Sequence, residues 1–105
     1  MSDVLNRLAD TIAARAGADA GESYTASLLA KGRNKCAEKF GEEAVEAIIA
    51  ATAEPESLHK EAADVLFHLQ VMLTASGVTW GDVLAELERR EGVSGHAEKA
   101  ARSKD

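Results

Sequence analysis

The sequence is poor in residues that interrupt helices or cross-link a chain. Its 105 residues include one proline and one cysteine, and aromatic residues make up only 4%. A single cysteine excludes an intramolecular disulfide and suits a reducing compartment. Scarce proline, together with abundant alanine and glutamate, favours helices. Because no long stretch alternates apolar and polar residues, we expect an all-α fold without strands.

The chain also lacks a basic surplus and a long apolar run. Its formal net charge of −6 argues against a general nucleic-acid-binding protein, because such a protein needs a basic face. No apolar run approaches the roughly 20 residues that span a bilayer, and the acidic N-terminal segment does not resemble a signal peptide. We therefore expect one cytoplasmic domain, residues 1–105, with neither nucleic acid nor a membrane as partner.

Caps and helix breakers predict four main helices. Ser23 and Thr79 are expected N-caps, Asp82 stands at the capping-box position after Thr79, and Gly32 ends a short helical turn. Trp80 is expected to anchor the start of the last main helix, with base stacking as the alternative. The main helices are expected at residues 3–15, 34–52, 55–76 and 80–91, with shorter helical turns at 24–31 and 94–102.

Charged side chains gather on one face of the expected helix 34–52. With Phe40 at zero and about 100° per residue, the charged stripe falls between about −60° and −160°. Spacings of three and four residues place its carboxylates within reach of one ion. The stripe contains three acidic residues and two basic residues upstream of them: Glu42, Glu43, Glu46, Lys35 and Lys39.

The expected helix 55–76 is apolar on two sides, with a polar slot between them. Glu61, Asp64 and His68 fill this slot, and we expect His68 to be a hydrogen-bonded residue rather than a metal ligand. Phe67 and Val71 lie opposite the longer apolar stripe, so we expect them to face a second chain. The longer stripe, expected to form the core, contains Leu58, Ala62, Val65, Leu66, Leu69, Met72 and Leu73.

Clustered carboxylates without paired cysteine or histidine suit a hard cation with oxygen ligands. Mg²⁺ fits best if a phosphate completes its coordination shell, since it rarely sits in a cage made of protein alone. A di-iron site is disfavoured, because such bundles need a Glu-x-x-His motif on each of two helices. The competing interpretation is a solvated acidic face on a non-catalytic helical pairing module.

Two motifs carry a resemblance to a known family. The pattern Glu42-Glu43-x-x-Glu46, followed after fourteen residues by Glu61-x-x-Asp64, resembles the EExxE…ExxD pattern of the MazG-like all-α nucleotide pyrophosphohydrolases. The flanking segments SYTASLLAKG at 23–32, KFGEE at 39–43 and REGVSGHAEKAAR at 90–102 are similar to those of the phosphoribosyl-ATP pyrophosphatase family. The resemblance covers roughly residues 4–102.

The resemblance implies a four-helix MazG-like bundle that is completed by dimerisation. It implies a homodimeric enzyme of histidine biosynthesis that hydrolyses phosphoribosyl-ATP to phosphoribosyl-AMP and pyrophosphate. Mg²⁺ would be the cofactor, with Mn²⁺ as a substitute. By motif position, the metal ligands would be Glu43, Glu46, Glu61 and Asp64.

The remaining charged residues suit the same chemistry. Glu42, at the edge of the acidic stripe, is our candidate general base. Lys35 and Lys39 are candidates to hold phosphate oxygens. The C-terminal segment is expected to bind a phosphate through Arg90, Ser94, Lys99 and Arg102. A general nucleoside triphosphate pyrophosphohydrolase remains the alternative enzyme, and it would need no site for a phosphoribosyl arm.

Overall fold

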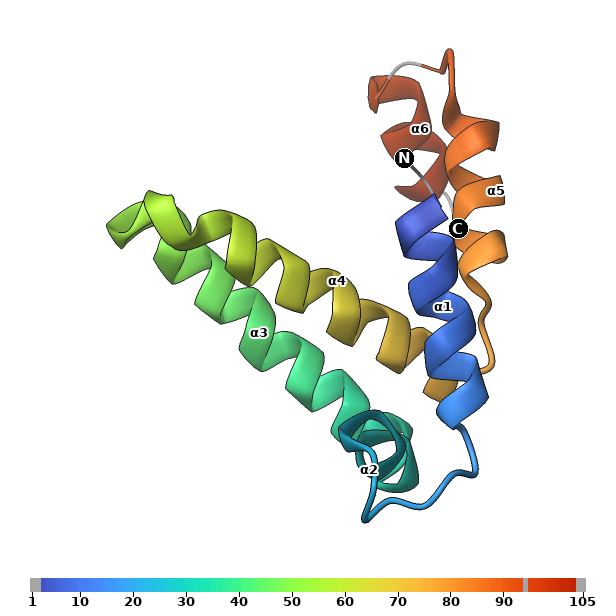
Figure 1. Ribbon diagram of the computed structural model, residues 1–105. Coiled ribbons are helices and arrows are strands. Elements are labelled where there is room, and N and C mark those ends of the chain that lie inside the picture. Colours follow the sequence, from blue (N-terminus) through green and yellow to red (C-terminus); the bar gives the residue numbers. More distant parts are fainter. Residues whose placement is uncertain (1–2, 94, 104–105) are drawn as a thin grey trace.

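The computed structural model describes residues 3–93 and 95–103, and every regular element in these ranges is helical (Figure 1). This confirms the all-α prediction. No helix among the described residues is long and apolar enough to cross a membrane. The elements are α1 (Asp3–Arg15), α2 (Tyr24–Ala30), α3 (Arg33–Ala53), the 3-10 turn η1 (Pro55–Ser57), α4 (Leu58–Ala75), α5 (Trp80–Arg90) and α6 (Gly95–Ser103).

Local capping explains where the helices begin. The Ser23 hydroxyl accepts a hydrogen bond of 3.1 Å from the Ala26 amide at the start of α2. Thr79 and Asp82 form the predicted capping box, each side chain accepting from the other residue's amide at 3.0 Å. Gly32 has a φ of 94°, a conformation that favours glycine, and this residue separates α2 from α3.

A long hairpin of α3 and α4 dominates the chain. These two helices form the most extensive helix pair, and η1 makes the turn between them. In Figure 1, α1 crosses the last turns of α4, and α2 lies at the start of α3. Beyond α4, α5 and α6 stand apart from the hairpin. The hairpin therefore leaves much of its length uncovered by the rest of the described chain.

The core lies where α1 and α2 meet the hairpin. Its buried residues are Ile12, Leu28, Cys36 and Val71, and partly buried apolar side chains surround them. Cys36 is a small buried packing residue, and its Sγ lies 3.2 Å from the Leu28 carbonyl oxygen. Burial raises the pKa of the Cys36 thiol, which makes this cysteine a poor nucleophile.

The prediction for the two apolar sides of α4 is wrong for Phe67, Val71 and Leu66, whereas Met72 of the expected core stripe does pack against the core. Val71 is fully buried and Phe67 packs against the core, so neither faces a second chain. Leu66, from the stripe that we expected in the core, is 38% exposed. The reason is that α1 and α2 pack on the Phe67 side of α4. Periodicity reveals both apolar faces, but it does not indicate which of them the chain itself covers.

Candidate functional site

Three carboxylates from the two hairpin helices converge. Glu43 of α3 and Glu61 and Asp64 of α4 each offer an oxygen, and these oxygens lie within 4.8 Å of one another. The antiparallel hairpin brings them together, because it pairs the middle of α3 with the first turns of α4. We call Glu43, Glu61 and Asp64 the carboxylate triad. Such a group can hold a metal ion.

The carboxylates of the triad repel one another. The pKa of Glu61 is raised, first by desolvation and then by the negative charges of Asp64, Glu46, Glu43 and Glu54. Glu46, the fourth residue predicted as a ligand, lies outside the triad but close enough for its charge to act on Glu61. It is exposed on α3, at the edge of the site.

Lys39 supplies positive charge beside the triad. Its Nζ lies 3.6 Å from an oxygen of Glu43 and 3.7 Å from an oxygen of Glu42. The pKa of Lys39 is raised, first by its electrostatic interaction with Tyr24 and then, against partial desolvation, by the charges of Glu42 and Glu43. Glu42 itself is largely exposed, which leaves its carboxylate accessible to water.

Lys35 is placed differently from Lys39. Its Nζ pairs with Glu38 at 3.2 Å, and both side chains are 58% exposed. The sequence pattern grouped Lys35 with Lys39, but the structure links only Lys39 to a carboxylate of the triad.

A hydrogen-bonded histidine on α4 connects this helix to α2. His68 is 6% exposed, and its Nδ1 donates to the Asp64 carbonyl oxygen at 2.8 Å. Its Nε2 faces the Tyr24 hydroxyl at 3.5 Å. His68 is thus the hydrogen-bonded residue that we predicted. Tyr24 was not predicted to lie at the site, although this residue belongs to the SYTASLLAKG segment that carries the resemblance.

The basic residues near the C-terminus are not at the triad. Arg90 pairs with Glu86 at 2.9 Å, and Arg89 pairs with the same carboxylate at 2.8 Å. Hydrogen bonds from Arg89 and Arg90 lower the pKa of Glu86 to about 2. Lys99 and Arg102 are exposed on α6, which lies away from the hairpin in Figure 1. Ser94 lies outside the described residues.

Comparisons with known proteins agree over nearly the whole chain. A family model described as phosphoribosyl-ATP pyrophosphohydrolase matches residues 5–91. A phosphoribosyl-ATP pyrophosphatase from Dinoroseobacter shibae is 66% identical over 100 residues, which cover 94% of this chain and 98% of the relative. One from Cereibacter sphaeroides is 65% identical, with 94% and 97% covered. One from Rhizorhabdus wittichii is 58% identical and covers 99% of both chains.

Proposed function

This chain belongs to the phosphoribosyl-ATP pyrophosphohydrolase family, and we propose that its carboxylate triad is the catalytic metal site. The enzyme hydrolyses phosphoribosyl-ATP to phosphoribosyl-AMP and pyrophosphate, a step of histidine biosynthesis. The observation that supports this location is the convergence of Glu43, Glu61 and Asp64 within 4.8 Å. We place the enzyme in the cytoplasm, in keeping with its single cysteine.

The triad fits a hard divalent cation. Its donors are carboxylate oxygens, and the pKa of Glu61 is raised first by desolvation and then by the charges of neighbouring carboxylates, whose repulsion a dication would relieve. Mg²⁺ suits this donor set, and Mn²⁺ accepts the same ligands. The residues that would hold the ion are Glu43, Glu61 and Asp64, with Glu46 reaching it from the edge of the site.

The residues around the triad suit the hydrolysis of a phosphoanhydride. When bound, Mg²⁺ would supply the positive charge that admits a triphosphate to an acidic site and stabilises the leaving pyrophosphate. Lys39 stays protonated at neutral pH and is placed to pair with a phosphate oxygen. Lys35, on the same helix, is a second phosphate contact. Glu42, exposed beside Lys39, would take the proton of the attacking water.

We propose that a second copy of the chain packs against the exposed apolar side of the α3–α4 hairpin. Three side chains of α3, Val45, Ile48 and Ile49, are 53%, 62% and 53% exposed, and Leu66 of α4 is 38% exposed. Val45, Ile48 and Ile49 share one face of α3 because they stand three and four residues apart, and exposed apolar surface of this kind marks an interaction site. We call these four residues the hairpin patch, and we assign the homodimer interface to it.

We assign the phosphoribosyl arm to the basic C-terminal segment. Arg90, Ser94, Lys99 and Arg102 would bind its phosphate. Because α6 lies apart from the hairpin of its own chain, this contact requires the segment of one copy to approach the triad of the other. A general triphosphate hydrolase would not need this segment.

Product analysis tests the proposal. The full chain is incubated with phosphoribosyl-ATP, ATP or dCTP, in Mg²⁺ and in EDTA, and pyrophosphate and the monophosphate product are quantified. We expect Mg²⁺-dependent release of pyrophosphate from phosphoribosyl-ATP and far slower release from the other two nucleotides. Equal rates on all three would indicate the general hydrolase. Undiminished activity after exhaustive metal removal would contradict the assignment of the triad.

A further inference from the structure

Tyr24 is the most exposed aromatic side chain of the protein. It is 57% exposed, whereas the other aromatic residues, Phe40, Phe67 and Trp80, are partly buried. Single exposed apolar residues are common on protein surfaces, so this exposure alone indicates no function. What distinguishes Tyr24 is that its ring is held in place by residues next to the triad.

Contacts with α4 fix the Tyr24 ring. It stacks on Phe67, with ring centroids 6.4 Å apart and planes 17° apart, and it meets the His68 ring edge-on. Because Nδ1 of His68 donates to a backbone carbonyl, neutral His68 has an acceptor at Nε2, to which the Tyr24 hydroxyl donates at 3.5 Å. Phe67 thus covers one face of the ring, and the exposure of Tyr24 leaves the other face open.

The open face lies at the end of the triad site nearest the core. His68 follows Asp64 by four residues, so it stands about one turn of α4 further along on the same side of the helix. On α3, Lys39 likewise stands one turn before Glu43. Tyr24 interacts electrostatically with Lys39, the residue that we assign to a phosphate oxygen. The ring therefore adjoins the place where the phosphates would lie.

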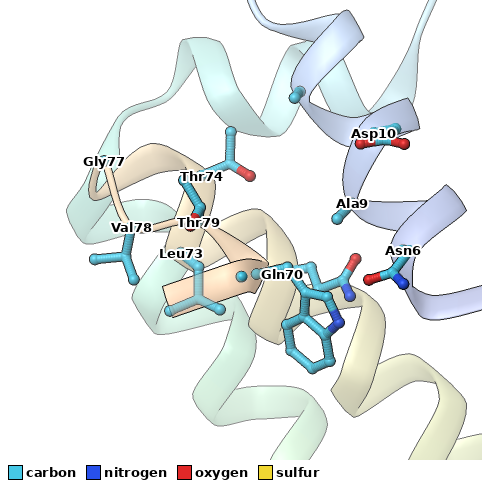
Figure 2. A pocket seen from close by; sticks show the side chains of 12 residues that line it. Asn6, Ala9, Asp10, Gln70, Leu73, Thr74, Gly77, Val78 and Thr79 are labelled. Atoms are coloured by element: carbon cyan, nitrogen blue, oxygen red, sulfur yellow. The ribbon is translucent and has the colours of Figure 1, made fainter. Parts of the chain in front are cut away.

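Trp80, for which base stacking was the alternative role, lies elsewhere. It lines a cavity of about 590 Å³ between α1 and the end of α4 (Figure 2). None of the triad carboxylates lines this cavity. Asp10 lines it as well, and its negative charge disfavours the phosphates of a nucleotide. Within one chain, Tyr24 and not Trp80 is the exposed ring beside the triad.

We propose that the open face of Tyr24 stacks on the adenine base of the substrate while the triad site holds the triphosphate. This inference rests on the catalytic site proposed above, because that site fixes the phosphates. The family acts on an adenine nucleotide, and a planar base fits an open aromatic face. Since Phe67 and His68 hold the ring before the substrate binds, little side-chain freedom is lost on binding.

Two ligands separate the base from the phosphates. α,β-Methylene-ATP carries adenine and resists cleavage between the α and β phosphates, whereas inorganic tripolyphosphate carries no base. Each is titrated by calorimetry into the full chain in Mg²⁺, and each ligand is compared with itself across variants. Tyr24→Leu removes the ring, so it should bind α,β-methylene-ATP about tenfold more weakly and tripolyphosphate as the wild type does. Tyr24→Phe is the matched control, because it keeps the ring and should keep most of the affinity for both ligands.

Nuclear magnetic resonance gives a direct measurement on the wild type, because Tyr24 is the only tyrosine in the sequence. In a chain labelled at tyrosine, the ring current of a stacked adenine should shift the Tyr24 ring signals upfield. Tripolyphosphate should leave these signals nearly unchanged. If Tyr24→Leu does not fold, the comparison of the two ligands on the wild type decides alone.

Asp64→Asn separates the failure of this inference from the failure of the catalytic site. It should weaken the binding of both ligands, because both depend on the metal ion. Unchanged binding of both ligands by Asp64→Asn, or no binding of either by the wild type, would contradict the catalytic site.

Three results would overturn the role of Tyr24 and leave the catalytic site in place. One is wild-type affinity of Tyr24→Leu for α,β-methylene-ATP. Another is an equal shift of the Tyr24 signals with both ligands, which would assign the shift to the phosphates or the metal ion. The third is an equal loss of both ligands in a folded Tyr24→Leu protein, which would mean that the ring supports the phosphate site and does not bind the base.

Discussion

Replacing Asp64 by asparagine distinguishes a metal-binding carboxylate from an ordinary surface acid. The Asp64 and Glu43 oxygens lie within 4.8 Å. Two unit charges at this distance repel by about 3.5 kcal/mol at an effective dielectric constant of about 20, and by about 1 kcal/mol in water. Asp64 is exposed, so the lower value applies. We therefore expect the metal-free Asp64→Asn protein to be about 1 kcal/mol more stable than the wild type.

The same change should impair catalysis, because asparagine keeps the shape of the ligand and loses its charge. We expect kcat/KM for phosphoribosyl-ATP to fall by at least about 100-fold. Two assays measure the gain in stability and the loss of activity. Thermal unfolding in EDTA should show a Tm about 4 °C higher than that of the wild type, and pyrophosphate release in Mg²⁺ should be slower. Adding Mg²⁺ should stabilise the wild type more than the variant, because a ligand stabilises the state that binds it.

Glu56→Gln is the control for this experiment. Glu56 is an exposed acid of η1 outside the triad, and its replacement should change neither stability nor rate. Near-wild-type turnover in Asp64→Asn, with no gain of metal-free stability, would refute the metal site. The acids would then be solvated residues of a helix face that binds no metal ion.

Four further predictions follow from the fold and the charges. Exhaustive chelation should abolish pyrophosphate release, and Mg²⁺ or Mn²⁺ should restore it. Val71→Ala should lower the free energy of unfolding in urea by about 2 kcal/mol, because Val71 is fully buried in the chain's own core. Ile48→Asp, at an exposed position, should instead leave the monomer folded and halve the mass measured by light scattering. The Glu86 carboxylate should titrate near pH 2 in NMR spectra of the folded chain; since its pKa is lowered from 4.5, the stability that it contributes is present above pH 4.5 and is lost as the pH falls towards 2. Truncation after Gly92 should reduce activity on phosphoribosyl-ATP much more than any activity on ATP, and equal losses would instead indicate that the segment serves the triphosphate or the fold.

Local signals in the sequence predict the helices well. Ser23 and Thr79 cap helices where expected, and the helix after Pro55 begins with the 3-10 turn η1. The spacing of three residues places Glu61 and Asp64 on one face of α4, because residues three or four apart share a helix face. These features depend on neighbours in the sequence, so a pattern of residues is enough to find them.

Features that depend on how the helices pack could not be predicted from the sequence. The burial of Val71 and the exposure of Leu66 follow from the side on which α1 and α2 pack. The position of Tyr24 beside Lys39 and His68 depends on how α2 meets the hairpin. In the sequence, Gln70 cannot be told from an exposed polar residue of a helix. The structure shows that it is buried and that it bonds to the Leu5 carbonyl oxygen of α1.

The carboxylate triad also has a consequence for the order of folding. All of its members belong to the continuous segment 33–75, which contains α3, η1 and α4. Closing a hairpin of neighbouring helices costs less chain entropy than docking distant segments, and local contacts form rapidly. We expect the hairpin to form early and to present its acids before α1 packs against α4. A divalent ion would then act during folding, by holding the hairpin closed while the rest of the chain assembles around it.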